Sequence, residues 1–131
     1  MQYLLTIYID EADFVHATPE DGMKMMAAYD AVTEELKQAG VYLGGEGLQA
    51  TSTATTVRVR DGEPLLTDGP FAETREQLAG FYLLDCGDLD EAVGWAAKIP
   101  SAAMGSVEVR PVITYVYRVA RAQAGGAAAH A

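Results

Sequence analysis

Four stretches of the chain have the apolar, β-branched and aromatic pattern that is typical of strands. Residues 2–10 and 77–85 are apolar over almost their whole length, and residues 106–118 are rich in valine. Residues 41–49 contain three glycines, which weaken a strand and indicate a β-bulge or a place where another group approaches the backbone closely. We therefore predict four core strands, of which the second is irregular.

A long helix is predicted between the first two strands. Thr18 offers a capping hydroxyl, Pro19 suits the first helical position, and Gly40 supplies a left-handed stop. Residues at three- and four-residue steps form one apolar face, which we expect to lie towards the core. These residues are Met25, Met26, Tyr29, Val32, Thr33 and Leu36.

A second helix is predicted after the third core strand. Asp88 followed by Glu91 resembles a capping box, and Pro100 limits the helix at its other end. We expect Leu89, Val93 and Ala96 to face the core.

The chain between the second and third core strands has the pattern of a hairpin. Residues 53–60 alternate, Asp61-Gly62 suits a tight turn, and residues 64–67 can return as the second arm. We interpret this hairpin as an insertion on the sheet rim, followed by a loop over residues 67–76.

The order of these elements predicts an α+β fold of the ferredoxin-like split βαβ type, with an antiparallel sheet and an inserted hairpin. Both helices should then cover one sheet face. The other face would be an exposed apolar patch, which a second copy can cover around a two-fold axis. We therefore expect a homodimer in which two sheets form a dimeric α/β barrel.

Chain length and composition favour one domain. A chain of 131 residues with 50% hydrophobic residues can bury a single continuous core. We expect this domain to span residues 1–118. Residues 119–131 are rich in alanine and lack packing signals, so we expect a flexible C-terminal tail.

The formal charge of -10 disfavours nucleic-acid binding, because phosphate backbones are themselves negative. The single cysteine, Cys86, excludes an intramolecular disulfide, and we expect it to serve packing. The first strand begins without a signal-peptide pattern, and no apolar run is long enough to span a bilayer. We therefore predict a cytoplasmic protein without membrane association.

Several motifs resemble those of the DGPF branch of the YCII-related family. They are Gly44-Gly45-Glu46-Gly47-Leu48, Thr56-Val57-Arg58-Val59-Arg60-Asp61-Gly62, Thr67-Asp68-Gly69-Pro70-Phe71, Gly80-Phe81-Tyr82-Leu83-Leu84-Asp85 and Val107-Glu108-Val109-Arg110-Pro111-Val112. The resemblance covers residues 2–115 and implies a dimeric α/β barrel. It also implies a bacterial protein, often encoded beside extracytoplasmic-function sigma factors.

Relatives in the wider family are proposed to use a histidine and an aspartate in a cleft, and one is a dehydrochlorinase that acts on a chlorinated hydroxyquinol. The resemblance places Tyr29 at the position of that histidine, so the expected base is absent here. His16 precedes the helix and His130 lies near the C-terminus, and neither is a persuasive replacement.

The segment Asp68-Gly69-Pro70-Phe71 has two interpretations. Aspartate, glycine and proline together favour a rigid structural turn. Alternatively, the turn presents Asp68 and Phe71 at a cleft.

Other candidate site residues also have structural alternatives. Glu46 lies among glycines and would act as a general base if burial raised its pKa, but it can also face water. Tyr29 is either a ligand contact or a core residue. Arg75 either binds a ligand carboxylate or joins a charged surface rim, and Arg110 is expected to pair with Glu108 or with a dimer mate.

No metal or cofactor motif is present. Two histidines and one cysteine lie far apart, and the glycine-rich segment lacks the features of a phosphate loop. The leading hypothesis is a small-molecule-binding dimeric barrel, with a cofactor-free lyase or isomerase activity that uses Glu46 or Asp68 for proton transfer. The alternative is a non-catalytic regulatory or partner-binding protein associated with a sigma factor.

Overall fold

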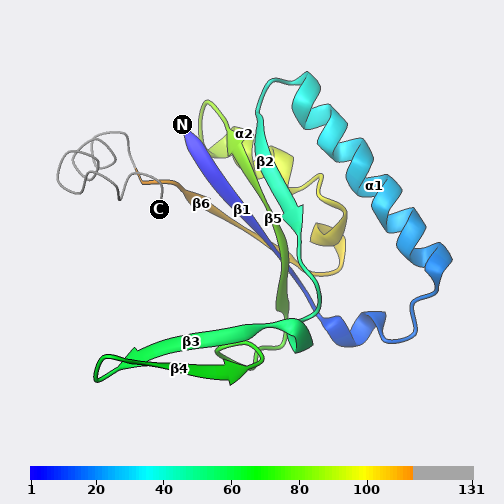
Figure 1. The fold of residues 1–131 in the computed structure, drawn as a ribbon. Helices are drawn as coiled ribbons and strands as arrows, with labels where there is room; N and C mark the ends of the chain where they lie inside the picture. Colours follow the sequence, from blue (N-terminus) through cyan, green and yellow to red (C-terminus); the bar gives the residue numbers. More distant parts are fainter. Residues whose placement is uncertain (114–131) are drawn as a thin grey trace.

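A computed structural model describes residues 1–113 and confirms the α+β fold (Figure 1). Its main sheet has four strands, each antiparallel to its neighbours, in the order β2-β5-β1-β6. The strands are β1 (Gln2–Ile9), β2 (Tyr42–Gly47), β5 (Gln77–Asp85) and β6 (Ser106–Pro111). The bulge predicted in the second strand is present, because the register of β2 against β5 shifts between Tyr42 and Gly44.

One face of the main sheet carries the core. Tyr3, Leu5 and Ile7 of β1 are buried at alternate positions, opposite Leu84, Tyr82 and Gly80 of β5. Side chains from both helices join this cluster, so both helices lie on this face, as expected from the sequence. The helical members of the cluster are Val32, Leu36, Ala92 and Ala96.

The helix α1 (Pro19–Gln38) begins and ends where its local signals predict. Thr18 Oγ1 accepts a hydrogen bond from the Asp21 amide at 3.1 Å, and the Thr18 amide donates to the Asp21 carboxylate at 3.0 Å. Gly40 has a φ of 75°, which glycine adopts without steric cost. Only Val32 and Leu36 of this helix are buried, and both lie in its C-terminal half.

The helix α2 (Leu89–Ala96) starts at the predicted cap, where Asp88 accepts a hydrogen bond from the Glu91 amide at 2.9 Å. The expectation that Leu89 and Val93 face the core was wrong, since they are 50% and 49% exposed. Ala96 faces the core as expected, together with Ala92. Their small side chains, one helical turn apart, allow the helix to approach the strands closely. The 3-10 helix η3 (Pro100–Ala103) that follows was not predicted.

The predicted hairpin forms a separate two-stranded sheet of β3 (Thr55–Arg60) and β4 (Glu63–Asp68). Asp61 and Gly62 have φ values of 52° and 78°, as a tight hairpin turn requires. Figure 1 shows the hairpin projecting away from the main sheet. Two further 3-10 helices, η1 (Glu11–Phe14) and η2 (Thr51–Thr53), lie in the connections after β1 and β2.

The strand expected over residues 106–118 ends earlier, because β6 stops at Pro111. The rest of that prediction, together with the tail predicted for residues 119–131, falls largely outside the described residues. Arg110 pairs with Glu108 at 2.8 Å, which is one of the two arrangements that we expected. Within residues 1–113, no helix combines the length and the apolar character needed to cross a membrane.

Candidate functional site

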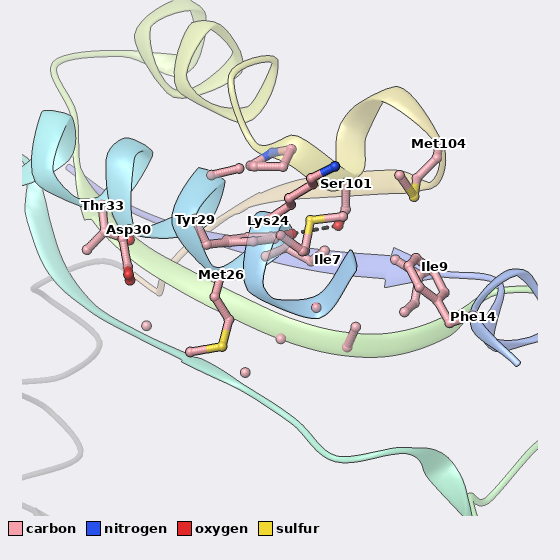
Figure 2. Close-up of a pocket in the computed structure, with 18 of the residues that line it drawn as sticks. Ile7, Ile9, Phe14, Lys24, Met26, Tyr29, Asp30, Thr33, Ser101 and Met104 are labelled. Carbon is pink, nitrogen blue, oxygen red and sulfur yellow. Dashed lines mark hydrogen bonds between the residues drawn. The ribbon is translucent and has the colours of Figure 1, made fainter. Parts of the chain in front are cut away.

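A cleft of about 980 Å³ lies between α1 and the main sheet. Figure 2 shows its labelled residues in three groups. Asp30 and Thr33 lie at one end, Tyr29, Lys24 and Ser101 in the middle, and the apolar side chains of Ile9, Phe14 and Met104 at the other end. The apolar side chains gather near Phe14, although Asp13 and His16 beside it also line the cleft.

The cleft exists because the N-terminal half of α1 does not pack on the sheet. Met23 and Met26 are 70% and 67% exposed, whereas Leu36 in the other half is 1% exposed. Beneath this part of the helix, the strands β2 and β5 contribute Gly45, Gly47 and Gly80 to the cleft lining. An overhanging helix and a sheet without side chains at these positions together leave room for a ligand.

Two pairs of hydroxyl groups lie at the boundary between the cleft and the core. Tyr29 Oη and Ser101 Oγ are 2.6 Å apart, and Thr33 Oγ1 and Tyr82 Oη are also 2.6 Å apart. Burial raises the pKa of Tyr82, while the hydrogen bond with Thr33 acts in the opposite direction. The Tyr82 phenol is therefore protonated at neutral pH and is able to donate a hydrogen bond.

Hydrogen bonds of Glu11 position the segment that carries Phe14 at one end of the cleft. Glu11 accepts hydrogen bonds from the Thr51 amide at 2.8 Å and from the Thr51 hydroxyl at 2.6 Å. The Glu11 amide also donates to the Gln77 side chain at 2.8 Å. These bonds connect η1 with η2 and β5 and fix the segment that carries Phe14.

Charged groups occur mainly on α1 and η1. Asp13, Asp21 and Asp30 line the cleft together with Lys24, whose Nζ lies 3.9 Å from Glu20. Lys24 and Glu20 are both highly exposed, so this pair contributes little to stability. Within residues 1–113, no three histidine, cysteine, aspartate or glutamate side chains are grouped for metal binding.

Glu46 contributes to the cleft lining from β2, but its side chain projects from the other face of the sheet. Gly45 pairs with Tyr82 and Gly47 with Gly80, whereas Glu46 pairs with Phe81. Directly opposed residues of antiparallel strands share a face, and successive residues alternate between faces. Tyr82 and Gly80 belong to the buried face, so the exposed Glu46 carboxylate lies on the opposite face and Glu46 meets the cleft through its backbone.

The remaining predicted site residues lie around the hairpin and are not part of the cleft lining. Asp68 is the exposed last residue of β4, and Phe71 is 78% exposed. Gly69 has a φ of 95°, its amide donates to the Ala54 carbonyl at 2.7 Å, and its carbonyl accepts from Thr56 at 2.8 Å. These contacts support the structural interpretation of the turn. Arg75 is also exposed and lies outside the lining.

Of the predicted site residues, the structure brings only Tyr29 and Glu46 to the cleft. Sequence reasoning missed Thr33 as a polar cleft residue, and it missed Tyr82 and Ser101 entirely. Thr33 lies on the predicted inner face of the helix, and this position could have indicated that its hydroxyl group reaches the cleft. Ser101 follows Pro100, which indicates only the end of a helix. No local sequence feature therefore indicated that Ser101 lines the cleft.

Together, the fold and the cleft define a small α+β protein with one main sheet and a ligand-sized opening under its first helix. Residues 1–116 match the YCII-related domain, and the chain belongs to the YCII-related family. An uncharacterized protein of Rhizobium meliloti (strain 1021), R00369, is 40% identical over 117 residues, covering 88% of this chain and 94% of that protein.

One solved structure with a similar fold is the 5-chloro-2-hydroxyhydroquinone dehydrochlorinase TftG from Burkholderia phenoliruptrix AC1100, in complex with 2,5-dihydroxybenzoquinone. The TM-score is 0.48 at 13% sequence identity, and the match covers 89% of this chain and 98% of that chain. At this level the likeness bears on neither the ligand nor the chemistry of the present protein.

Proposed function

We propose that this protein binds a small, largely apolar molecule in the cleft under α1. The observation that carries the proposal is the cleft itself, whose volume of about 980 Å³ lies within the range of ligand sites. Such sites combine mostly apolar walls with a few polar groups that orient the ligand. Ile9, Phe14 and Met104 provide the walls, and the hydroxyl groups of Tyr29 and Ser101 provide the polar contact.

The Tyr29–Ser101 pair is suited to recognise one polar group of a ligand. When two hydroxyls share one hydrogen bond, one proton remains free to donate, and lone pairs on both oxygens remain free to accept. The pair therefore accommodates either a carbonyl or a hydroxyl group. Because the pair lies between Thr33 and the apolar side chains near Phe14, it would hold a ligand with its apolar body towards those side chains.

The test is a thermal-shift screen of the wild-type protein against a metabolite panel. A ligand that binds the folded state raises the melting temperature in proportion to its occupancy. The variant Tyr29→Phe should weaken binding of the selected ligand by up to about 1.5 kcal/mol, the contribution of one neutral hydrogen bond. Tyr3→Phe is the matched control, because the Tyr3 hydroxyl donates to the Met1 sulfur at 3.6 Å and Tyr3 does not line the cleft. No shift with any compound would contradict the proposal.

A finer proposal is that the protein is a cofactor-free lyase or isomerase, which requires a group that moves a proton. Glu46 and Asp68 are the predicted bases, and Asp30 is a carboxylate of the cleft lining. Once a ligand is known, exchange of one of its C–H protons for deuterium in D2O would report proton transfer. A carboxylate removes the proton, and a deuteron from the solvent replaces it. Asp30→Asn tests the carboxylate of the cleft lining, and Glu46→Gln and Asp68→Asn test the predicted bases, whose carboxylates lie away from the cleft. Absence of exchange in the wild type would contradict this finer proposal and leave the binding proposal standing.

We further propose that the protein is a homodimer that covers the open sheet face. Leu4, Tyr8, Phe81 and Leu83 lie on this face and are partly exposed. Analytical ultracentrifugation should show a dimer for the wild type and a monomer for Leu83→Lys. Met23→Lys places the same charge on an exposed side chain of α1 and should leave the dimer intact. A monomeric wild type would exclude this assembly.

The competing hypothesis is a regulatory or partner-binding protein linked to a sigma factor. Its structural support is the exposed apolar surface around the hairpin, where Val57, Leu66 and Phe71 are 58%, 71% and 78% exposed. Assignment to the DGPF branch belongs to this hypothesis as well and stays a prediction. A pull-down with the neighbouring sigma factor at micromolar concentration tests it, since binding that survives Leu66→Ser and Phe71→Ser would exclude this surface.

A further inference from the structure

Three glycines lie on the cleft side of the sheet, and two of them have a structural reason within the chain. A Cβ atom at Gly45 would lie 2.7 Å from the Tyr82 ring and 2.8 Å from the Phe81 carbonyl oxygen. A Cβ atom at Gly80 would lie 2.7 Å from the Glu46 carbonyl oxygen. Real Cβ atoms essentially never approach so closely, so the packing of β2 against β5 requires glycine at both positions.

No contact within the chain explains why residue 47 is glycine. A Cβ atom there would have no neighbour within 4 Å, and its φ lies outside the left-handed region. Glycine inside a strand is unfavourable compared with alanine, because it loses more conformational freedom on folding and contributes no packing. Gly47 lines the cleft and pairs with Gly80, so the space that its side chain would fill belongs to the cleft.

Gly47 and Gly80 leave bare backbone as part of the cleft floor, and the Tyr82 ring borders it where the ring lies beside Gly45. Gly45 and Gly47 are next to each other on this face of β2, and Gly80 lies opposite Gly47 on β5. The other side of the cleft is formed by α1, where Met25 and Met26 line it. Peptide planes below and polarizable thioethers above favour a flat conjugated group, because thioether sulfur interacts favourably with aromatic rings.

We infer that the cleft holds a ligand with a planar conjugated ring that lies flat against Gly47 and Gly80, and that Gly47 sets the depth of the site. This inference rests on the proposed function of the cleft. The ring carries one hydrogen-bonding edge that meets the hydroxyl groups of Tyr29 and Ser101. A puckered ring of equal size loses contact with the flat floor.

Two probes with the same carbon skeleton test the shape preference. Both 2-naphthol and decahydro-2-naphthol contain one hydroxyl group, but only the first is flat. Isothermal titration of the wild-type protein should give a Kd for 2-naphthol at least about tenfold lower than for its saturated counterpart, a difference of about 1.4 kcal/mol. Equal affinities would overturn the inference and leave the proposed cleft function standing.

Paired glycine variants test the position. A Cβ atom at Gly44 would likewise have no neighbour within 4 Å, but Gly44 pairs with Leu83 on the open sheet face and does not line the cleft. Gly47→Ala should raise the melting temperature, and Gly47→Ala, but not Gly44→Ala, should weaken the binding of 2-naphthol. Gly47→Leu should abolish binding, with the folded state checked by circular dichroism.

The outcomes separate the two proposals. Unchanged 2-naphthol affinity in folded Gly47→Leu would overturn the role of Gly47. Failure of 2-naphthol to bind the wild type, while the metabolite panel yields a non-planar ligand that depends on Tyr29, would overturn the planar preference alone. Failure of both the probes and the panel would overturn the proposed function together with this inference.

Discussion

The two halves of α1 differ sharply in what surrounds them. In the C-terminal half, Val32 and Leu36 are 4% and 1% exposed and belong to the core. In the N-terminal half, Met23 and Met26 are 70% and 67% exposed, although the helix is continuous through both. The comparison shows that one half anchors the helix by burial, whereas the other depends on its cap and leaves a cleft beneath it.

The largest expected effect comes from removing the anchor. Leu36→Ala should lower the free energy of unfolding by about 2–5 kcal/mol, because a buried leucine loses its transfer energy and leaves a cavity. Met23→Ala, in the exposed half, should change it by less than about 0.5 kcal/mol. Urea unfolding of both variants measures the difference, and equal effects would show that the two halves are not distinct.

The cap should matter next. Thr18→Ala removes the acceptor of the Asp21 amide and should lower the free energy of unfolding by about 1 kcal/mol. Thr18→Ser keeps a hydroxyl and serves as the control. Hydrogen exchange should accelerate mainly in the N-terminal half of α1, which has no buried side chain to retain it. Uniform acceleration along the helix would contradict the division into halves.

The hydroxyl pairs Tyr29–Ser101 and Thr33–Tyr82 lie at the boundary between the two halves of α1. Thr33→Val removes the hydrogen-bond partner of the Tyr82 hydroxyl at nearly constant side-chain volume. The substitution should lower the free energy of unfolding by about 1 kcal/mol. A double-mutant cycle with Tyr82→Phe isolates the bond from other effects of each substitution. A coupling energy indistinguishable from zero would remove this pair from the stabilising contacts of the helix.

The smallest expected effect is on alkaline stability. Burial raises the pKa of Tyr82 in the folded state. The unfolded chain therefore loses the phenol proton first, at pH values above about 10, so this contribution to stability is complete below that pH and declines as the pH rises further. Tyr82→Phe should unfold with a weaker pH dependence in this range. The same slope in both proteins would indicate that Tyr82 is not responsible.

Much of the fold was predictable because its signals are local. The Thr18 cap, the Gly40 stop and the Asp61-Gly62 turn each act within a few residues, and each lies where it was predicted. The register of the strands follows from alternation between a buried and an open face. The core face of α2 was predicted correctly only at Ala96, because the small Ala92, and neither Leu89 nor Val93, is buried with it.

The candidate site was predicted only in part. Tyr29 was recognised on the inner face of α1 and lies in the cleft. Glu46 was recognised by its glycine neighbours, but a shift of one residue along a strand reverses the face, so the pattern alone did not place its carboxylate. Asp68, Phe71 and Arg75 were grouped with them through motif proximity, and the hairpin carries them away from the cleft lining.

The sequence by itself determined where α1 and α2 begin, where α1 ends and where the hairpin turns, because those limits depend on neighbouring residues. Only the tertiary structure decided that Tyr29 meets Ser101, 72 residues away, and that Thr33 meets Tyr82, 49 residues away. It also decided that half of α1 overhangs the sheet. Such pairings depend on how the whole core packs, and the apolar periodicity of α1 is the same over the anchored half and over the half that covers the cleft.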